Sequence, residues 1–134
     1  MTSTYVYRLI KSSWGIRIAI TARVEQRAAV EGVRISPRGQ LWLEFPNVSL
    51  LTESEKEEVA KGLRYVSREI AEKVGSQVLT VVIESIAYVE SDFQLEGLSV
   101  AMLRWAEVEF GLQVHEIVET FSRESNRYIL EWPR

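Results

Sequence analysis

The fold class is decided by one stretch, Val82-Ile83-Glu84-Ser85-Ile86-Ala87-Tyr88-Val89-Glu90-Ser91-Asp92-Phe93-Gln94-Leu95-Glu96-Gly97-Leu98. Its first half is β-branched and apolar, which predicts a strand, and an acidic, aromatic loop then opens a helix. A nucleophile elbow, a phosphate-binding loop and a metal-binding cluster each need residues that this stretch lacks. The stretch therefore indicates a fold and no particular chemistry.

Strands are also predicted upstream, at residues 5–10, 16–24, 33–35 and 40–45. The second of these alternates strictly, with five apolar residues on one face and the arginines Arg17 and Arg23 on the other. Such alternation is typical of a strand with one buried and one solvated face. Leu41, Leu43 and Phe45 follow the same pattern in the last segment.

A helix is predicted over residues 52–74. Thr52 and Glu55 have the spacing of a capping box at its start, and Gly75 is well placed to end it. One apolar stripe runs along it, formed by Val59, Leu63, Val66, Ile70 and Val74. Gly62 lies in mid-helix, where we expect a close approach of the backbone to the sheet.

Downstream we expect a second helix from near residue 95 to 111, and a hairpin of strands at 112–121 and 128–132. The complete order is three or four strands, helix, strand, helix and C-terminal hairpin. This order predicts a two-layer α/β (α+β) sandwich, in which a mixed sheet carries both helices on one face. We expect one domain over residues 1–134, with the arginines of the 16–24 strand on the solvated face of the sheet.

The composition is that of an ordinary globular protein, with 46% hydrophobic and 26% charged residues among 134. There is no cysteine, which excludes disulfides, thiol catalysis and cysteine-ligated metals. The apolar runs are far shorter than the roughly 20 residues that a membrane-spanning helix needs. Residues 1–5 lack a signal-peptide pattern. We therefore expect a cytoplasmic protein without membrane segment or cofactor.

Charge is distributed unevenly along the chain. Residues 1–40 hold seven basic and two acidic side chains (+5), residues 41–100 hold five and eleven (−6), and residues 101–134 hold four and six (−2). If these regions stay apart in the fold, the molecule is dipolar, which favours a charged partner. The other interpretation is a solvated outer face of the sheet.

Three features between residues 59 and 111 carry a resemblance to a known family. They are the segment Val59-Ala60-Lys61-Gly62-Leu63, the strand at 78–83, and Asp92 ahead of a helix that contains Gly97 and Ala101. In these features the chain resembles domain IV of translation elongation factor G, of the ribosomal protein S5 domain-2-like superfamily. The resemblance implies a core order β(3)-α-β-α, which the predicted order matches, and it favours contact with RNA or the ribosome.

The chain departs from this family at several points. A Gly-Gly-x-Ile-Pro type segment precedes the first helix in elongation factors, and here it is replaced by Asn47-Val48-Ser49-Leu50-Leu51. The sequence contains no GTPase domain. It also lacks the Gly- and Ser-rich phosphate loop of the small-molecule kinases in the same superfamily. Neither translocation nor kinase activity is expected.

Tyr88, Asp92 and Glu96 are spaced four residues apart around the start of the second helix. One interpretation is a small acidic site for acid–base work or for a hard cation. The other is that Asp92 caps the helix and Glu96 favours its dipole. His115 is the only histidine, and because no nucleophile is recognisable near it, we expect a structural or surface role.

Aromatic and basic residues supply the other candidates for partner binding. Trp14 lies in a polar turn and could anchor an interface or fold back over the core edge. Trp42 is out of phase with its buried neighbours, so we expect it on the basic sheet face, where an arginine could stack on it. Arg123, Asn126 and Arg127 form the last turn and could grip a carboxylate or phosphate, or simply be solvated.

The sequence favours a non-catalytic module that binds a protein partner, such as a small cytoplasmic regulatory or immunity-type factor. Its binding surface would be formed by the basic, aromatic face or by the acidic loop, with these candidates: Trp14, Arg17, Arg23, Trp42, Asp92, Glu96, Arg123 and Arg127. The first alternative is RNA or ribosome binding through the basic N-terminal sheet, although overall acidity opposes it. The second is an enzyme that uses Tyr88, Asp92 and Glu96. No metal site is expected.

Overall fold

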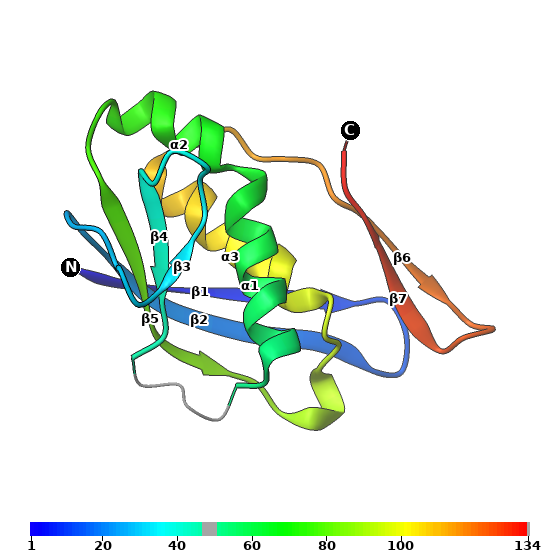
Figure 1. Cartoon of the computed structure of the whole chain (residues 1–134). Helices are drawn as coiled ribbons and strands as arrows, with labels where there is room; N and C mark the ends of the chain where they lie inside the picture. Colours follow the sequence, from blue (N-terminus) through cyan, green and yellow to red (C-terminus); the bar gives the residue numbers. More distant parts are fainter. Residues whose placement is uncertain (47–50, 134) are drawn as a thin grey trace.

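The computed structural model describes residues 1–46 and 51–133 (Figure 1). The five strands of the main sheet are β1 (Thr2–Ile10), β2 (Gly15–Glu25), β3 (Val33–Arg34), β4 (Leu41–Glu44) and β5 (Leu79–Ala87). The helices are α1 (Glu53–Tyr65), α2 (Ser67–Val74) and α3 (Gly97–Phe110), with a short 3₁₀ turn at Glu90–Asp92. A separate hairpin consists of β6 (Val118–Ser122) and β7 (Arg127–Glu131).

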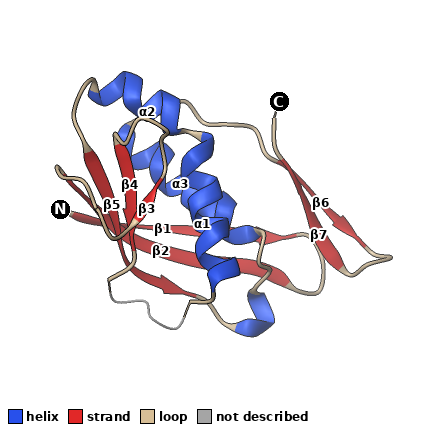
Figure 2. Cartoon of the chain, in the orientation of Figure 1, coloured by secondary structure: helices blue, strands red, loops and turns tan. Residues whose placement is uncertain are grey.

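The main sheet is mixed, with the strand order β1-β2-β5-β4-β3. Its central strand, β5, is antiparallel to β2 and parallel to β4. Figure 2 shows the helices gathered on one side of this sheet, with the β6–β7 hairpin apart from it. The predicted two-layer arrangement of strands, helix, strand, helix and hairpin is therefore confirmed.

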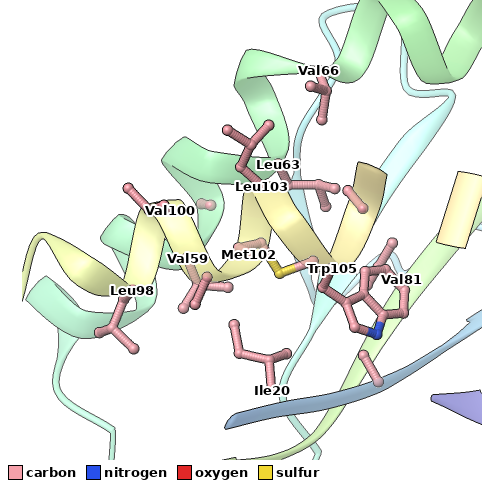
Figure 3. Close-up of a cluster of buried hydrophobic side chains, with 14 of the residues drawn as sticks. Ile20, Val59, Leu63, Val66, Val81, Leu98, Val100, Met102, Leu103 and Trp105 are labelled. Carbon is pink, nitrogen blue, oxygen red and sulfur yellow. The ribbon is translucent and has the colours of Figure 1, made fainter. Parts of the chain in front are cut away.

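The core lies between the sheet and the helices α1 and α3 (Figure 3). The predicted alternation of β2 is confirmed, since Ile16, Ile18 and Ile20 are each at most 1% exposed while Arg17 is exposed. Leu63 of α1 is fully buried in the same hydrophobic core as these isoleucines. Burying side chains of this size contributes about 1.5–3 kcal/mol each to folding, before the entropy cost of ordering them.

The prediction of one helix over residues 52–74 is wrong, because the structure has two helices there, α1 and α2. Val66 leaves the helical conformation, with φ −109° and ψ 11°, and its N–H bonds to the carbonyl of Leu63. Val66 stays fully buried, so the apolar stripe continues across the break. The spacing of the apolar residues therefore gives no sign of the helix break at Val66. The predicted capping box of Thr52 and Glu55 is present at the start of α1.

Gly62 does mark a close approach, but to α3 and not to the sheet. A Cβ added at Gly62 would lie 2.2 Å from the carbonyl oxygen of Ser99 and 3.0 Å from Cβ of Met102. The two helices therefore cross backbone to backbone at this point, and only glycine fits there.

The predicted strand at 112–121 begins only at Val118. Residues 112–117 pair with no strand, because their polar groups are taken by α3: the N–H of Leu112 bonds to the carbonyl of Glu107, and the N–H of His115 to the Glu107 carboxylate. Residues 47–50, in the segment that replaces the elongation-factor motif, lie outside the described residues.

Candidate functional site

One surface of the main sheet carries no helix. We call it the open face; it consists of the side chains of β1, β2 and β5 that alternate with the buried ones: Thr2, Thr4, Val6, Arg8, Ile10, Arg17, Ala19, Thr21, Ser85 and Ala87. The sequence predicted a solvated sheet face over the whole layer. The structure has one at the β1–β2 side only.

At the β4–β5 side the same surface is covered by the segment between β2 and β3. The hydroxyl of Thr80 donates a hydrogen bond to the carbonyl of Arg27 at 2.6 Å, and Ala29 is only 2% exposed. Val82, opposite Arg23 in the ladder, is fully buried although it lies on this side of the sheet. This half of the sheet is therefore closed.

Ion pairs form part of the cover. Arg23 pairs with Glu25 at 2.7 Å and also with Glu84, and Arg27 pairs with Glu25 and Glu44, both at 2.6 Å. Hydrogen bonds from Arg23 and Arg27 hold the pKa of Glu25 below its ordinary value. Two arginines thus meet three glutamates, and the basic N-terminal region interleaves with acidic residues from β4 and β5. Arg23, a predicted binding residue, is engaged inside the molecule.

Arg8 and Arg17 differ from Arg23 and Arg27, which are paired with glutamates. Arg8 and Arg17 lie directly opposite each other on β1 and β2, and both are exposed. Neither makes an ion pair within residues 1–46 and 51–133. Like charges directly opposite each other destabilise a sheet. Nearby are Lys11 in the following turn and Ile10, which is 76% exposed. This end of the open face is basic, with an apolar side chain beside it.

Trp42 projects from β4 on the side away from the helices, as predicted, opposite Arg34 of β3. Its Nε1 donates to the carbonyl of Gly39 at 2.8 Å. In the part of the chain that the structure describes, the cation–π contacts join Lys56 to Phe45 and Lys61 to Trp132, and no arginine stacks on Trp42. Because β4 belongs to the closed half of the sheet, Trp42 lies away from the Arg8–Arg17 end.

Trp14 packs onto the C-terminal hairpin. Its ring lies edge-on to Tyr128 at 5.0 Å and to Phe121 at 6.0 Å, and its Nε1 donates to Oδ1 of Asn126 at 3.1 Å. Of the two roles that the sequence allowed, the geometry is that of a ring folded back over the core edge. It joins the β1–β2 turn to the hairpin.

The side chains of Tyr88 and Glu96 are bonded to different parts of the protein. The Tyr88 hydroxyl donates to Glu55 of α1 at 2.7 Å, and its ring stacks on Phe93 at 4.0 Å. Glu96 accepts two bonds from Arg127 of the hairpin, at 2.7 and 2.9 Å. No hydrogen bond between described residues joins the three predicted side chains to one another.

The predicted helix cap at Asp92 is also wrong. Glu96, not Asp92, occupies the N-cap position of α3, and its side chain makes no capping bond. Asp92 ends the 3₁₀ turn, five residues before Gly97, the first residue of α3. Arg127 is held by Glu96, whereas Arg123 is exposed at the tip of the hairpin turn.

His115 stands in a polar cluster with Glu107, Glu69 and Arg104, which the sequence did not reveal. Its Nδ1 lies 2.7 Å from Oε2 of Glu107, and its Nε2 lies 2.9 Å from Oε1 of Glu69. Arg104 completes the cluster, donating to Glu107 at 2.9 Å and to the His115 carbonyl at 2.7 Å. Burial lowers the pKa of His115, but the hydrogen bonds to Glu107 and Glu69 outweigh burial and raise that pKa above 6.5.

The cluster has the features of a structural tie. Both ring nitrogens of His115 face carboxylates from different helices, so neither nitrogen is directed at a substrate position. Glu107 is 3% exposed. One sequence signal could have indicated this cluster: Glu107 is a charged residue on the buried stripe of α3, four residues after Leu103.

The hollows of the described surface include one of about 440 Å³, lined by Glu44, Phe45, Glu53 and Lys56, among others. A second, of about 410 Å³, runs between the β3–β4 turn and α2 and is lined by Arg38, Arg68, Ser36 and Ser67, among others. Another, of about 290 Å³, lies beside the His115 cluster and is lined by Glu69, Glu72 and Lys73. None of the three includes Tyr88, Asp92 or Glu96.

Comparisons with known proteins add no relative: no protein-family model matches the chain, and no curated protein matches it. Within residues 1–46 and 51–133, no helix has both the length and the apolar character that crossing a bilayer requires. Over the same residues, no three His, Asp or Glu side chains are grouped so that they could hold a metal ion.

Proposed function

We propose that this protein is a non-catalytic binding module that docks on an acidic surface of a protein partner through the Arg8–Arg17 end of its open face. As a small regulatory or immunity-type factor, it would mask or modulate that partner. The proposal places it in the cytoplasm, and the lack of cysteine is compatible with that compartment.

One observation carries the proposal. Arg8 and Arg17 are paired across the ladder on a sheet surface that no helix covers, while Arg23 and Arg27 are neutralised by glutamates. Opposed like charges lower the stability of a sheet. An acidic partner would remove that cost on binding and would gain charge-assisted hydrogen bonds to both guanidinium groups.

The neighbouring side chains support a protein partner over a bare polyanion. Ile10 is 76% exposed next to the arginines, and the pair Val6 and Ala19 lies beside the pair Arg8 and Arg17 on the same face. Protein interfaces combine arginine with apolar contact area at their centre. The patch is small, so its affinity depends on a few well-placed side chains.

RNA or ribosome binding is the second candidate. The hollow of about 410 Å³ lined by Arg38 and Arg68 favours it, since guanidinium groups bind phosphate well. The resemblance to elongation factor G domain IV favours it as well. Against it stand the net charge of −3 and the neutralised Arg23 and Arg27.

An enzyme built on Tyr88, Asp92 and Glu96 has the least support. The Tyr88 hydroxyl is bonded to Glu55, and the Glu96 carboxylate is bonded to Arg127. A catalytic pair of carboxyl groups needs to converge on one reacting position. The side chains of Tyr88 and Glu96 are therefore already engaged, with two different parts of the protein.

The test is capture of the tagged protein and its partners from a lysate of the cells that express it, with and without RNase, read by mass spectrometry. We expect one stoichiometric protein partner that persists after RNase. Recovery of ribosomal proteins that disappear with RNase would replace the proposal by the RNA alternative.

A further inference from the structure

β1 is the outermost strand of the main sheet and has a neighbour on one side only. It is nine residues long, Thr2–Ile10, and contains neither proline nor lysine. Sheets usually protect a long edge strand with such residues, with a bulge or with a covering segment. The register of β1 with β2 is continuous over all nine residues, without a bulge.

The hydroxyl of Tyr128 reveals which backbone groups of β1 point outward. It accepts a bond from the N–H of Lys11 at 2.8 Å and donates one to the carbonyl of Trp14 at 2.7 Å. Lys11 and Trp14 would form the next pair after Ile10 and Gly15. The hydroxyl therefore takes the place of a direct ladder hydrogen bond between the N–H of Lys11 and the carbonyl of Trp14. These two backbone groups point toward each other.

Ladder hydrogen bonds in an antiparallel pair alternate between residues. Counting back from Lys11, the odd-numbered residues of β1 direct their N–H and C=O groups at β2. Gly15 agrees with this, since a Cβ added there would lie 2.6 Å from the carbonyl oxygen of Leu9. The remaining residues direct their backbone groups outward: Thr2, Thr4, Val6, Arg8 and Ile10. Within residues 1–46 and 51–133, no other residue forms a hydrogen bond with these outward N–H and C=O groups.

The same residues place their side chains on the open face, because backbone and side-chain alternation share one period. A residue of an added strand opposite Arg8 would set its side chain beside Arg8, which already faces Arg17 on the other side. A carboxylate at that position would lie beside the two opposed guanidinium groups.

A second copy of the chain fits this edge poorly. β1 contains no acidic residue. Two copies paired antiparallel about Val6 would set Thr4 of one opposite Arg8 of the other, so no carboxylate would meet either arginine. The edge therefore favours a chain of different sequence.

We propose that the outer edge of β1 binds an extended, acidic segment of the partner protein as an additional strand of the sheet. The inference rests on the proposed function and specifies how the partner docks. Backbone hydrogen bonds from Thr4, Val6 and Arg8 would supply affinity, and an acidic residue opposite Arg8 would supply specificity.

The probe for this edge is a synthetic nine-residue peptide in which glutamate alternates with valine and threonine, and the control peptide has lysine in place of glutamate. Amide hydrogen exchange of the full chain is followed by NMR at rising peptide concentration. In the free protein we expect fast exchange at Val6 and Arg8 and slow exchange at Tyr5 and Tyr7. The glutamate peptide should slow exchange at Val6 and Arg8, and the lysine peptide should not.

Two variants separate backbone pairing from charge. Val6→Pro removes one outward N–H at an edge position that tolerates proline, whereas Val6→Ala trims the side chain and keeps the N–H. We expect Val6→Pro to bind the glutamate peptide about tenfold more weakly than Val6→Ala, since it loses a backbone hydrogen bond. Cooperative thermal unfolding of both variants checks that they fold. If either variant fails to fold, the amide exchange experiment on the unaltered chain still tests the inference.

The outcomes distinguish this inference from the proposed function. If Arg8→Glu with Arg17→Glu abolishes peptide binding but Val6→Pro binds as Val6→Ala does, the open face binds acidic chains and strand addition is overturned. If the peptide binds all these variants equally, or leaves Val6 and Arg8 unprotected, the β1 edge is not its site. Protection of the same amides that rises with protein concentration alone would assign the edge to a second copy and overturn the inference.

Discussion

The carboxylate of Glu107, on the buried side of α3, accepts hydrogen bonds from the backbone N–H of His115 at 2.6 Å and lies 2.7 Å from its ring Nδ1. Glu69 of α2 lies on the other side of the ring, at Nε2. The irregular segment 112–117 is thus fixed to two helices by one imidazole. This contact positions the chain that leads into the β6–β7 hairpin.

The His115 contact makes folding stability depend on pH. Protonation of the imidazole gives both ring nitrogens an N–H to donate to Glu107 and Glu69. The folded state therefore raises the pKa of His115 above its ordinary value of 6.5, despite the opposing effect of burial. A group whose pKa is raised on folding stabilises the folded state below its unfolded pKa, and this stabilisation is lost as the pH rises through the folded pKa.

We expect the free energy of unfolding, measured by chemical denaturation, to fall when the pH is raised from about 6 to about 9. His115→Gln should remove most of that dependence. A wild-type protein whose stability is the same at both pH values would contradict the proposed role of the imidazolium.

Glu107 should be the most sensitive charged position in this cluster. Glu107→Ala leaves Arg104 and His115 without their shared carboxylate in a site where Glu107 is 3% exposed. Breaking a buried ion pair from one side costs about 3–5 kcal/mol. Urea denaturation measures the loss, and Glu116→Ala, at an exposed glutamate nearby, is the matched control that should change stability by less than about 0.5 kcal/mol.

Gly62→Ala should destabilise the protein although alanine is the better helix former by about 1 kcal/mol. The new Cβ would lie 2.2 Å from the carbonyl oxygen of Ser99, so α1 and α3 would have to separate. Overpacking of this kind costs about 1–3 kcal/mol. A thermal midpoint equal to or above that of the wild type would show that the crossing of α1 and α3 is looser than described.

Tyr128→Phe should loosen the hairpin without removing the ring. The hydroxyl bridges the N–H of Lys11 and the carbonyl of Trp14, and Tyr128 is 2% exposed. Leaving these two backbone groups unsatisfied costs about 1–3 kcal/mol. Amide exchange at Lys11 should become faster, while exchange at Ile83 in the central strand should change only with global stability. Unchanged exchange at Lys11 would contradict the bridging role.

Much of the fold follows from local patterns in the sequence. The strict alternation of residues 16–24 gave β2 its buried face, and the capping box at Thr52 gave the start of α1. The break at Val66 was not predictable, because the buried residues keep helical spacing across it. Gly62 signalled a close approach, but only the three-dimensional packing identifies Ser99 as the neighbour.

The candidate site was less predictable because it depends on pairing between strands. Residue type singled out Arg17 and Arg23 equally, whereas Arg23 is engaged by its near neighbour Glu25 and by Glu84 of β5, which is distant in the sequence. Arg8 could have been inferred from the four-residue turn at 11–14, which sets Ile10 opposite Gly15 and hence Arg8 opposite Arg17. The role of Trp14 depended on the hairpin that packs against it, more than 100 residues later.

The most direct measurement compares partner capture by charge-reversed variants in RNase-treated lysate of the native cells, quantified by mass spectrometry. The test variant is Arg8→Glu with Arg17→Glu. The matched control, Arg68→Glu with Lys73→Glu on the exposed side of α2, changes the net charge equally. We predict that the control retains the partner and that the test variant loses it by about tenfold or more. Equal recovery by the two variants, or loss from the control alone, would contradict the assignment of binding to the open face.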